Sequence, residues 1–138
     1  EMAAQPPDSQ ADRYSVMKIY KEFFFDAAHF LPYAEEGHPN RRMHGHSFRV
    51  VVWLAGKPSP ETGLVRHFED LERHVMAVRE QLDHHLLNEI EGLEFPTLER
   101  IAAWIWNALA TPLPEISRVE VHRASCREGC IYDGPGEE

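Results

Sequence analysis

The residues with the clearest chemical potential are histidines, of which the chain has nine in 138 residues. His44 and His46 flank Gly45 just before strand-like sequence, and residues two apart in a strand point to the same face. His29 closes the preceding strand-like segment and, in an antiparallel pair, could lie beside them. Three neutral imidazoles suit Zn²⁺ in a site that keeps a fourth position open for water or substrate. The alternative is that they are unrelated polar residues at strand ends, and an H-x-H spacing alone does not decide.

A second group combines a carboxylate with an imidazole. Asp83 precedes His84, and a carboxylate beside an imidazole can fix its tautomer and raise its basicity, which suits proton transfer near neutral pH. The alternative is a solvated helix end, where a histidine binds the last carbonyls. Thr97 and Glu99 have a similar structural explanation as a helix cap and a first-turn acid. Taken alone, both groups favour the structural explanation.

Strands must position the histidines. Residues 17–28 are rich in aromatic and β-branched types, which predicts a strand that is buried on much of both faces and ends near His29. Residues 30–42 have the composition of a loop. Residues 47–55 alternate in the manner of a second strand, so we expect an antiparallel hairpin.

Two helices and a further strand pair follow. The apolar positions of residues 68–82 form the stripe of an amphipathic helix, namely Leu71, Val75, Val78 and Leu82. Thr97 caps a second helix, whose predicted buried face consists of Ile101, Ile105 and Leu109. A last strand runs through Val119 and Val121 to Arg123, with a short extension at 131–132. This order predicts an α+β domain with two helices on one face of an antiparallel four-stranded sheet.

Composition indicates one soluble globular domain, with 43% hydrophobic and 27% charged residues. The net charge of −9 disfavours nucleic acid or an anionic membrane as the main partner. No apolar run is long enough to span a bilayer.

The two cysteines, Cys126 and Cys130, form neither a disulfide framework nor a zinc ligand set by themselves, which predicts a cytoplasmic location. We expect a flexible extension at 1–16, the domain at 17–134 and a tail at 135–138.

Five motifs, taken in order, closely resemble the 6-pyruvoyl-tetrahydropterin synthase family, and its nearest branch looks like bacterial 6-carboxytetrahydropterin synthase of the queuosine pathway. The motifs are Phe25-Asp26-Ala27-Ala28-His29, His44-Gly45-His46, Leu82-Asp83-His84, Pro96-Thr97-Leu98-Glu99 and Gly129-Cys130-Ile131-Tyr132. The resemblance covers residues 17–134, and the ordered set is far more specific than any single motif.

The resemblance implies a tunnelling fold, in which each subunit's sheet joins its neighbours in a closed barrel of a homo-oligomer and active sites form between subunits. It implies three zinc ligands, which are His29, His44 and His46. In this family zinc holds the side-chain oxygens of 7,8-dihydroneopterin triphosphate and acidifies its carbon-bound protons. Asp83 and His84 match a pair that shuttles protons as triphosphate leaves, and Thr97 and Glu99 fall in the stretch that lines the pterin pocket.

Two positions depart from the family pattern. Asn40 stands where the family has its cysteine base, and an amide cannot act as a base. Arg123 or Ala124 stands where the family has a glutamate that pairs with the amino-pyrimidine edge of the pterin, and an arginine offers donors only. Asn40 and Arg123 are therefore the positions at which substrate contacts should differ.

The resulting expectation is a zinc-dependent lyase on a pterin-like small molecule, with His84 taking over part of the missing base's work. One alternative is a diverged zinc-containing paralogue that processes another, anionic small molecule bound by Arg123. Another is a catalytically silent binding protein of the same fold.

Overall fold

The structure, a computed structural model, describes residues 14–136, and a pair of long antiparallel strands forms its centre. Strands β1 (Met17–His29) and β2 (His44–Gly56) pair along their whole length, from Met17 opposite Gly56 to His29 opposite His44. The predicted hairpin is confirmed. However, β2 begins before the predicted start at residue 47, because the His-Gly-His segment continues the ladder with the end of β1.

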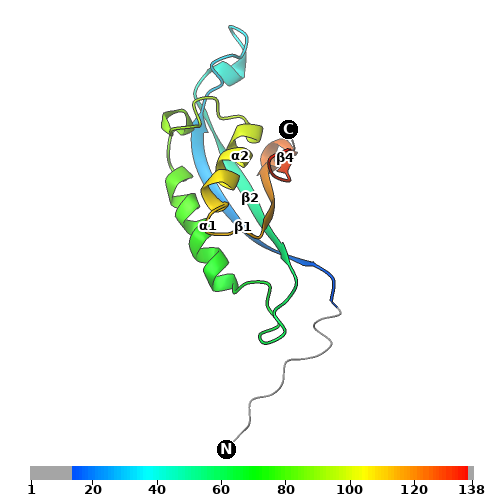
Figure 1. Ribbon diagram of the computed structural model, residues 1–138. Helices are drawn as coiled ribbons and strands as arrows, with labels where there is room; N and C mark the ends of the chain where they lie inside the picture. Colours follow the sequence, from blue (N-terminus) through cyan, green and yellow to red (C-terminus); the bar gives the residue numbers. More distant parts are fainter. Residues whose placement is uncertain (1–13, 137–138) are drawn as a thin grey trace, which may run out of the picture.

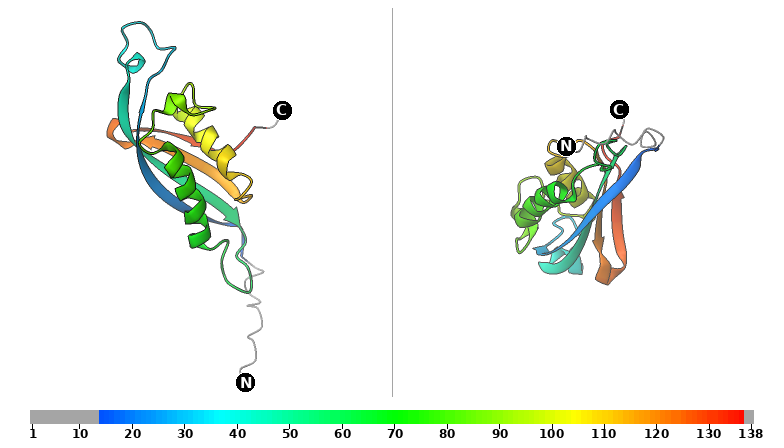
Figure 2. Two further views of the ribbon diagram at one scale, coloured as in Figure 1. Left: turned by 90° about the vertical axis from the view of Figure 1, so that its left-hand side faces the viewer. Right: turned by 90° about the horizontal axis from the view of Figure 1, so that it is seen from below.

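The sheet buries one face and leaves the other open. Phe23, Phe25 and Ala27 of β1 are buried, whereas Tyr20 and Phe24 are 53% and 57% exposed. The expectation that β1 is buried on both faces is therefore wrong for the single chain. Both helices cover the same face, and no described element covers the other (Figure 2). The aromatic residues of β1 therefore indicate a preference for strand conformation and do not by themselves indicate burial.

The two helices are α1 (Phe68–Leu82) and α2 (Leu98–Leu109), and they lie side by side on the buried face of the sheet (Figure 1). The predicted stripe of α1 is confirmed, because its buried residues are Leu71, Val75, Val78 and Leu82. Thr97 is the N-cap of α2, and its side chain accepts a hydrogen bond from the Arg100 N–H at 3.2 Å. No helix within residues 14–136 is long and apolar enough to cross a membrane.

Strands β3 (Ile116–Arg123) and β4 (Glu128–Tyr132) complete the sheet, whose order is β1-β2-β3-β4 with all neighbours antiparallel. A single 3-10 turn, η4 (Ala124–Cys126), links them. β4 is longer than the predicted two-residue extension because it pairs with β3 back to Glu128 opposite Arg123. β1 and β4 are the edge strands.

A long loop, residues 30–43, projects beyond the sheet between β1 and β2 (Figure 1). It contains the 3-10 turn η2 (Pro39–Arg41), and the Leu31 N–H donates to the Asn40 carbonyl at 2.7 Å to close its base. A second 3-10 turn, η3 (Leu87–Glu89), lies between the helices. The predicted extension 1–16 lies mostly outside the described residues, as do the last two residues of the predicted tail.

Candidate metal centre and proton-transfer pair

Three histidines meet where the β1–β2 hairpin ends. His29 and His44 are opposite each other in the register, and His46 follows two residues along β2. All three side chains point to the helix-facing side, because they continue the parity of buried Phe25 and Phe48. One ligand atom from each lies within 4.8 Å of the others, close enough to hold one ion. The predicted cluster of His29, His44 and His46 therefore exists in the fold.

Backbone carbonyls fix the orientation of two of these rings. His29 Nδ1 is 3.0 Å from the Pro96 carbonyl oxygen, and His44 Nδ1 is 2.7 Å from the Arg42 carbonyl oxygen. A carbonyl only accepts, so each Nδ1 must carry the proton and each Nε2 of a neutral ring keeps a lone pair.

The Nε2 atoms converge without a protein donor between them. His29 Nε2 and His44 Nε2 are 3.0 Å apart, and His46 Nε2 is buried with no hydrogen-bond partner. Two lone pairs at this distance repel unless a cation lies between them, and a buried orphan acceptor is costly. A metal ion satisfies all three atoms at once, so this donor set fits Zn²⁺, which neutral imidazoles bind readily.

Burial keeps two of the three rings neutral, those of His29 and His46. Burial lowers the pKa of His29 from 6.5 to about 4. The hydrogen bond to the Pro96 carbonyl opposes this shift, and the charges of His44, His46 and Arg123 lower the pKa further by smaller amounts. Burial also lowers the pKa of His46. The imidazoles of His29 and His46 are therefore unprotonated near pH 7, in the form that binds a metal.

The Asp83–His84 pair is held against the outer edge of β1. Asp83 ends α1, and its Oδ1 accepts the Asp26 N–H at 2.9 Å. The His84 N–H donates to the Asp26 carbonyl at 2.7 Å, and the Ala28 N–H donates to the His85 carbonyl at 3.1 Å. Together with a parallel bridge between Ala28 and Leu86, these hydrogen bonds attach the segment after α1 to β1.

His84 is oriented by a carboxylate and not by a helix carbonyl. Its Nδ1 is 2.8 Å from Asp83 Oδ2, its side chain is 79% exposed, and its φ of 59° is rare for a residue with a side chain. The Asp26 N–H, His84 and Arg79 hold the pKa of Asp83 below its usual range. Asp83 therefore stays ionised and leaves His84 Nε2 free to take up or release a proton. The neighbouring His85 is the ring that binds a carbonyl of the helix end, that of Asp83.

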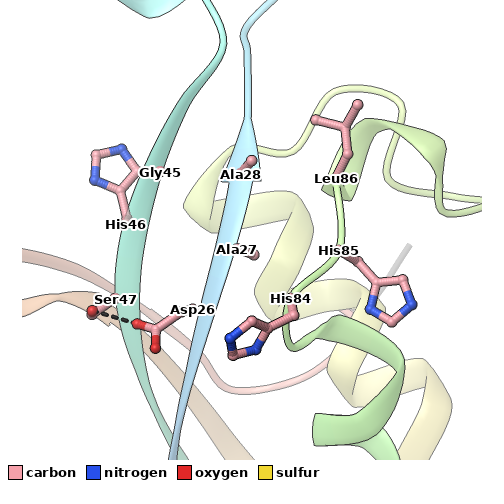
Figure 3. Close-up of a pocket in the computed structure, with 9 residues that line it drawn as sticks. All are labelled: Asp26, Ala27, Ala28, Gly45, His46, Ser47, His84, His85 and Leu86. Carbon is pink, nitrogen blue, oxygen red and sulfur yellow. Dashed lines mark hydrogen bonds between the residues drawn. The ribbon is translucent and has the colours of Figure 1, made fainter.

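The pair does not meet the histidine cluster within one chain. An open cleft of about 560 Å³ crosses the end of β1, with His46 at one side and His84 at the other. Figure 3 shows His46 on β2 and His84 beyond β1, with the two imidazoles not directed at each other. The structure thus brings the three histidines together and pairs Asp83 with His84, but it places the two groups on different sides of the strand.

A model of one protein family, described as 6-pyruvoyl tetrahydropterin synthase, matches residues 18–135. The chain belongs to this family.

Curated relatives agree with this family. A 6-carboxy-5,6,7,8-tetrahydropterin synthase of Synechocystis is 44% identical over 123 residues, which cover 85% of this chain and 93% of the relative. A dihydroneopterin monophosphate aldolase of Pyrococcus furiosus is 36% identical over 105 residues, which cover 76% of this chain and 83% of the relative.

Solved structures agree on the fold. The 6-pyruvoyl tetrahydropterin synthase of Caenorhabditis elegans superposes with a TM-score of 0.76 at 21% identity, over 88% of this chain and 97% of that chain. The predicted tunnelling fold of the subunit, an antiparallel four-stranded sheet with two helices on one face, is confirmed. The closed barrel of several subunits stays a prediction.

The remaining predicted site residues of this family member are scattered around the cluster. Thr97 acts as a helix cap, as its structural explanation predicted, and it directly follows Pro96, which holds His29. Glu99 is exposed on the first turn of α2, and its charge, after the effect of burial, raises the pKa of Cys130 on β4. Asn40 uses its backbone to close the loop, with its N–H donating to His38 Nδ1 at 3.0 Å.

Arg123 lies on the helix-facing side at the end of β3. Its Nη2 is 2.8 Å from Glu128 Oε1 on β4, and its Nε is buried without a partner. Sequence reasoning did not assign a role to Glu128, although its position opposite Arg123 across a tight strand connection was a usable signal. It also missed the carbonyls of Pro96 and Arg42, which no side-chain pattern reveals.

Proposed function

We propose that this chain is a zinc-dependent lyase that acts on 7,8-dihydroneopterin triphosphate or a related dihydropterin, as a synthase of the 6-carboxytetrahydropterin type. The observation that carries the proposal is the convergence of three imidazoles on the helix-facing side of the hairpin, where His29 Nε2 and His44 Nε2 are 3.0 Å apart and His46 Nε2 is buried without a hydrogen-bond partner. The Synechocystis relative supports this substrate class. His29, His44 and His46 would hold the zinc ion, which when bound supplies a Lewis acid for the oxygens of the pterin side chain.

The chain's own residues supply the proton transfer. Asp83 holds His84 in the tautomer that carries the proton on Nδ1, so Nε2 accepts a proton and later returns it. Asn40 contributes no titratable group at the position of the family's base, so in this proposal His84 takes over part of that work. Thr97, Glu99, Asn40 and Arg123 remain the proposed substrate contacts.

We infer that the active chain is a homo-oligomer with active sites between subunits. His84 is largely exposed at the β1 edge. The segment after α1 already occupies this edge near Asp26 and Ala28, so the remaining length of β1 and the edge strand β4 would pair with other copies. His84 of one subunit would then serve the histidine cluster of another.

A second candidate is aldol cleavage of a dihydroneopterin phosphate. The Pyrococcus furiosus relative is named for such an activity, and Asn40 removes the thiol expected for the synthase reaction. Both reactions would use the same metal site and the same pterin ring, but they release different fragments of the side chain.

The deciding experiment incubates zinc-loaded protein with 7,8-dihydroneopterin triphosphate and with the monophosphate, and identifies products by mass spectrometry. We expect loss of triphosphate and formation of a 6-carboxy product, abolished in His44→Ala and retained in His67→Ala. His67 is a suitable control because it is an exposed histidine at the other end of α1, with no side-chain capping bond. A 6-hydroxymethyl product from either substrate would favour the aldolase. Absence of any product would contradict both.

A further inference from the structure

Two buried side-chain nitrogens lack a hydrogen-bond partner within residues 14–136, and they are His46 Nε2 and Arg123 Nε. The first is explained by the metal cluster. The second is a donor, so no metal can satisfy it. Because an unpaired buried donor costs free energy, the Arg123 Nε–H points to a missing acceptor.

The register places this donor beside the histidine cluster. His122 of β3 pairs with Arg49 of β2 in an antiparallel register. The next residue of β3, Arg123, therefore lies across from Phe48, which is two residues from His46 in β2. Arg123 continues the parity of buried Val119 and Val121, and His46 continues that of buried Phe48, so both side chains lie on the helix-facing side. The two orphan atoms thus belong to neighbouring strands on one face.

The charge of the guanidinium is already compensated. Glu128 Oε1 lies 2.8 Å from Arg123 Nη2, and the Arg123 side chain is only 18% exposed against 50% for Glu128. A ligand carboxylate or phosphate at Nε would lie near the carboxylate of Glu128. The Arg123–Glu128 ion pair has no net charge with which to attract such an anion. A neutral carbonyl oxygen accepts one hydrogen bond without adding charge, so it matches one remaining buried N–H.

We propose that Arg123 Nε donates to the ring carbonyl of a bound pterin, and that Arg123 is therefore the residue that selects a carbonyl over an amino group at this position of the ligand ring. The inference rests on the proposed function for the class of ligand. Glu128 is a positioning residue, which holds the guanidinium so that Nε faces the ligand.

The test uses two ring probes that differ at the carbonyl. One is 6-hydroxymethylpterin, and the other is 2,4-diamino-6-hydroxymethylpteridine, in which an amino group replaces the ring carbonyl. Binding of each to zinc-loaded and to EDTA-treated protein is measured by fluorescence titration at pH 8. The variants are Arg123→Met, which keeps an unbranched stem without donors, and Glu128→Gln, which keeps a polar acceptor at Nη2. Metal content and thermal unfolding are recorded for each protein.

We expect the wild type to bind the pterin at least about tenfold more tightly than the diamino probe, as one hydrogen bond from a charged donor provides. Arg123→Met should lose this preference with unchanged metal content, and Glu128→Gln should retain part of it. Equal binding of both probes by the wild type, or an unchanged preference in Arg123→Met, would overturn the role of Arg123 and leave the proposed function standing. If inorganic phosphate competed with the pterin in the wild type but not in Arg123→Met, the site would be an anion site and the proposal would be wrong. Failure of both probes to bind would contradict the proposed function, and this inference with it.

Discussion

At the residue scale, the metal site depends on two backbone carbonyls as much as on three side chains. The carbonyls of Pro96 and Arg42 oblige His29 and His44 to carry their protons on Nδ1, so both Nε2 atoms face inward. The grouping of the three histidines was predictable, because strand parity and antiparallel pairing bring them to one face. The carbonyls were not, because any residue type offers one and only the fold brings Pro96 to β1.

The depressed pKa of His29 gives the metal-free protein a pH-dependent stability. The folded ring resists protonation down to about pH 4, whereas the unfolded ring takes up a proton near pH 6.5. The unfolded state therefore binds more protons in this window, and stability present above pH 6.5 is lost as pH falls towards 4. We expect the free energy of unfolding of EDTA-treated protein to drop by about 2 kcal/mol between pH 7.5 and 5 through this ring.

Urea unfolding at the two pH values measures this drop. His29→Gln has no group that titrates in the window, so its pH dependence should be weaker by that amount. Equal slopes for the wild type and His29→Gln would show that His29 titrates alike in both states.

His84 carries the proton transfer in the proposed reaction, so its removal should lower kcat and leave the metal in place. We expect His84→Ala to reduce kcat by about 10²–10⁴-fold, the usual contribution of a general base. Steady-state turnover of dihydroneopterin triphosphate, measured beside zinc content, provides the check, with His67→Ala as the control. Full activity in His84→Ala would assign the base to another residue.

At the element scale, α2 connects stability to the metal site, since its cap Thr97 directly follows Pro96. Thr97→Ala removes the hydroxyl that accepts the Arg100 N–H and should cost about 1 kcal/mol of unfolding free energy. Thr97→Ser keeps this acceptor and should be close to the wild type in urea unfolding. Equal stability of the alanine and serine variants would mean that the cap is not what stabilises this helix start.

The elements differed in how far the sequence determined them. The bounds of α1, residues 68–82, were predicted to the residue. Apolar residues at helical spacing with polar residues on the other sides fit a single helix over this range. The start of β2 was set too late, because His-Gly-His has no strand propensity of its own and is extended by pairing with 27–29. The exposure of Tyr20 and Phe24 agrees with the predicted placement of both helices on one face, whereas the aromatic composition of the strand by itself favoured burial of both faces.

At the scale of the whole molecule, the sheet has two edge strands and one face that no element within residues 14–136 covers. Free edges invite pairing with other strands, and barrel closure would remove them. Within one chain, β1 also lies between His84 and the histidine cluster. Both features have one explanation if the working site is assembled from neighbouring copies.

Co-expression of two inactive variants tests this assembly. His44→Ala lacks the metal site but keeps His84, and His84→Ala keeps the metal site. Mixed oligomers with sites shared between subunits should recover part of the wild-type activity, because some sites combine an intact cluster with an intact His84. No recovery in purified mixed oligomers, or a stable monomer by sedimentation at micromolar concentration, would argue against shared sites.

The central claim is that His29, His44 and His46 hold one zinc ion, and the most direct measurement is the metal content of the purified protein by plasma emission spectrometry. The account predicts one zinc ion per chain in the wild type and in His67→Ala, and almost none in His44→Ala after dialysis, with both variants folded by circular dichroism. Full zinc occupancy in folded His44→Ala, or a wild type that takes up no zinc when it is supplied, would contradict the account.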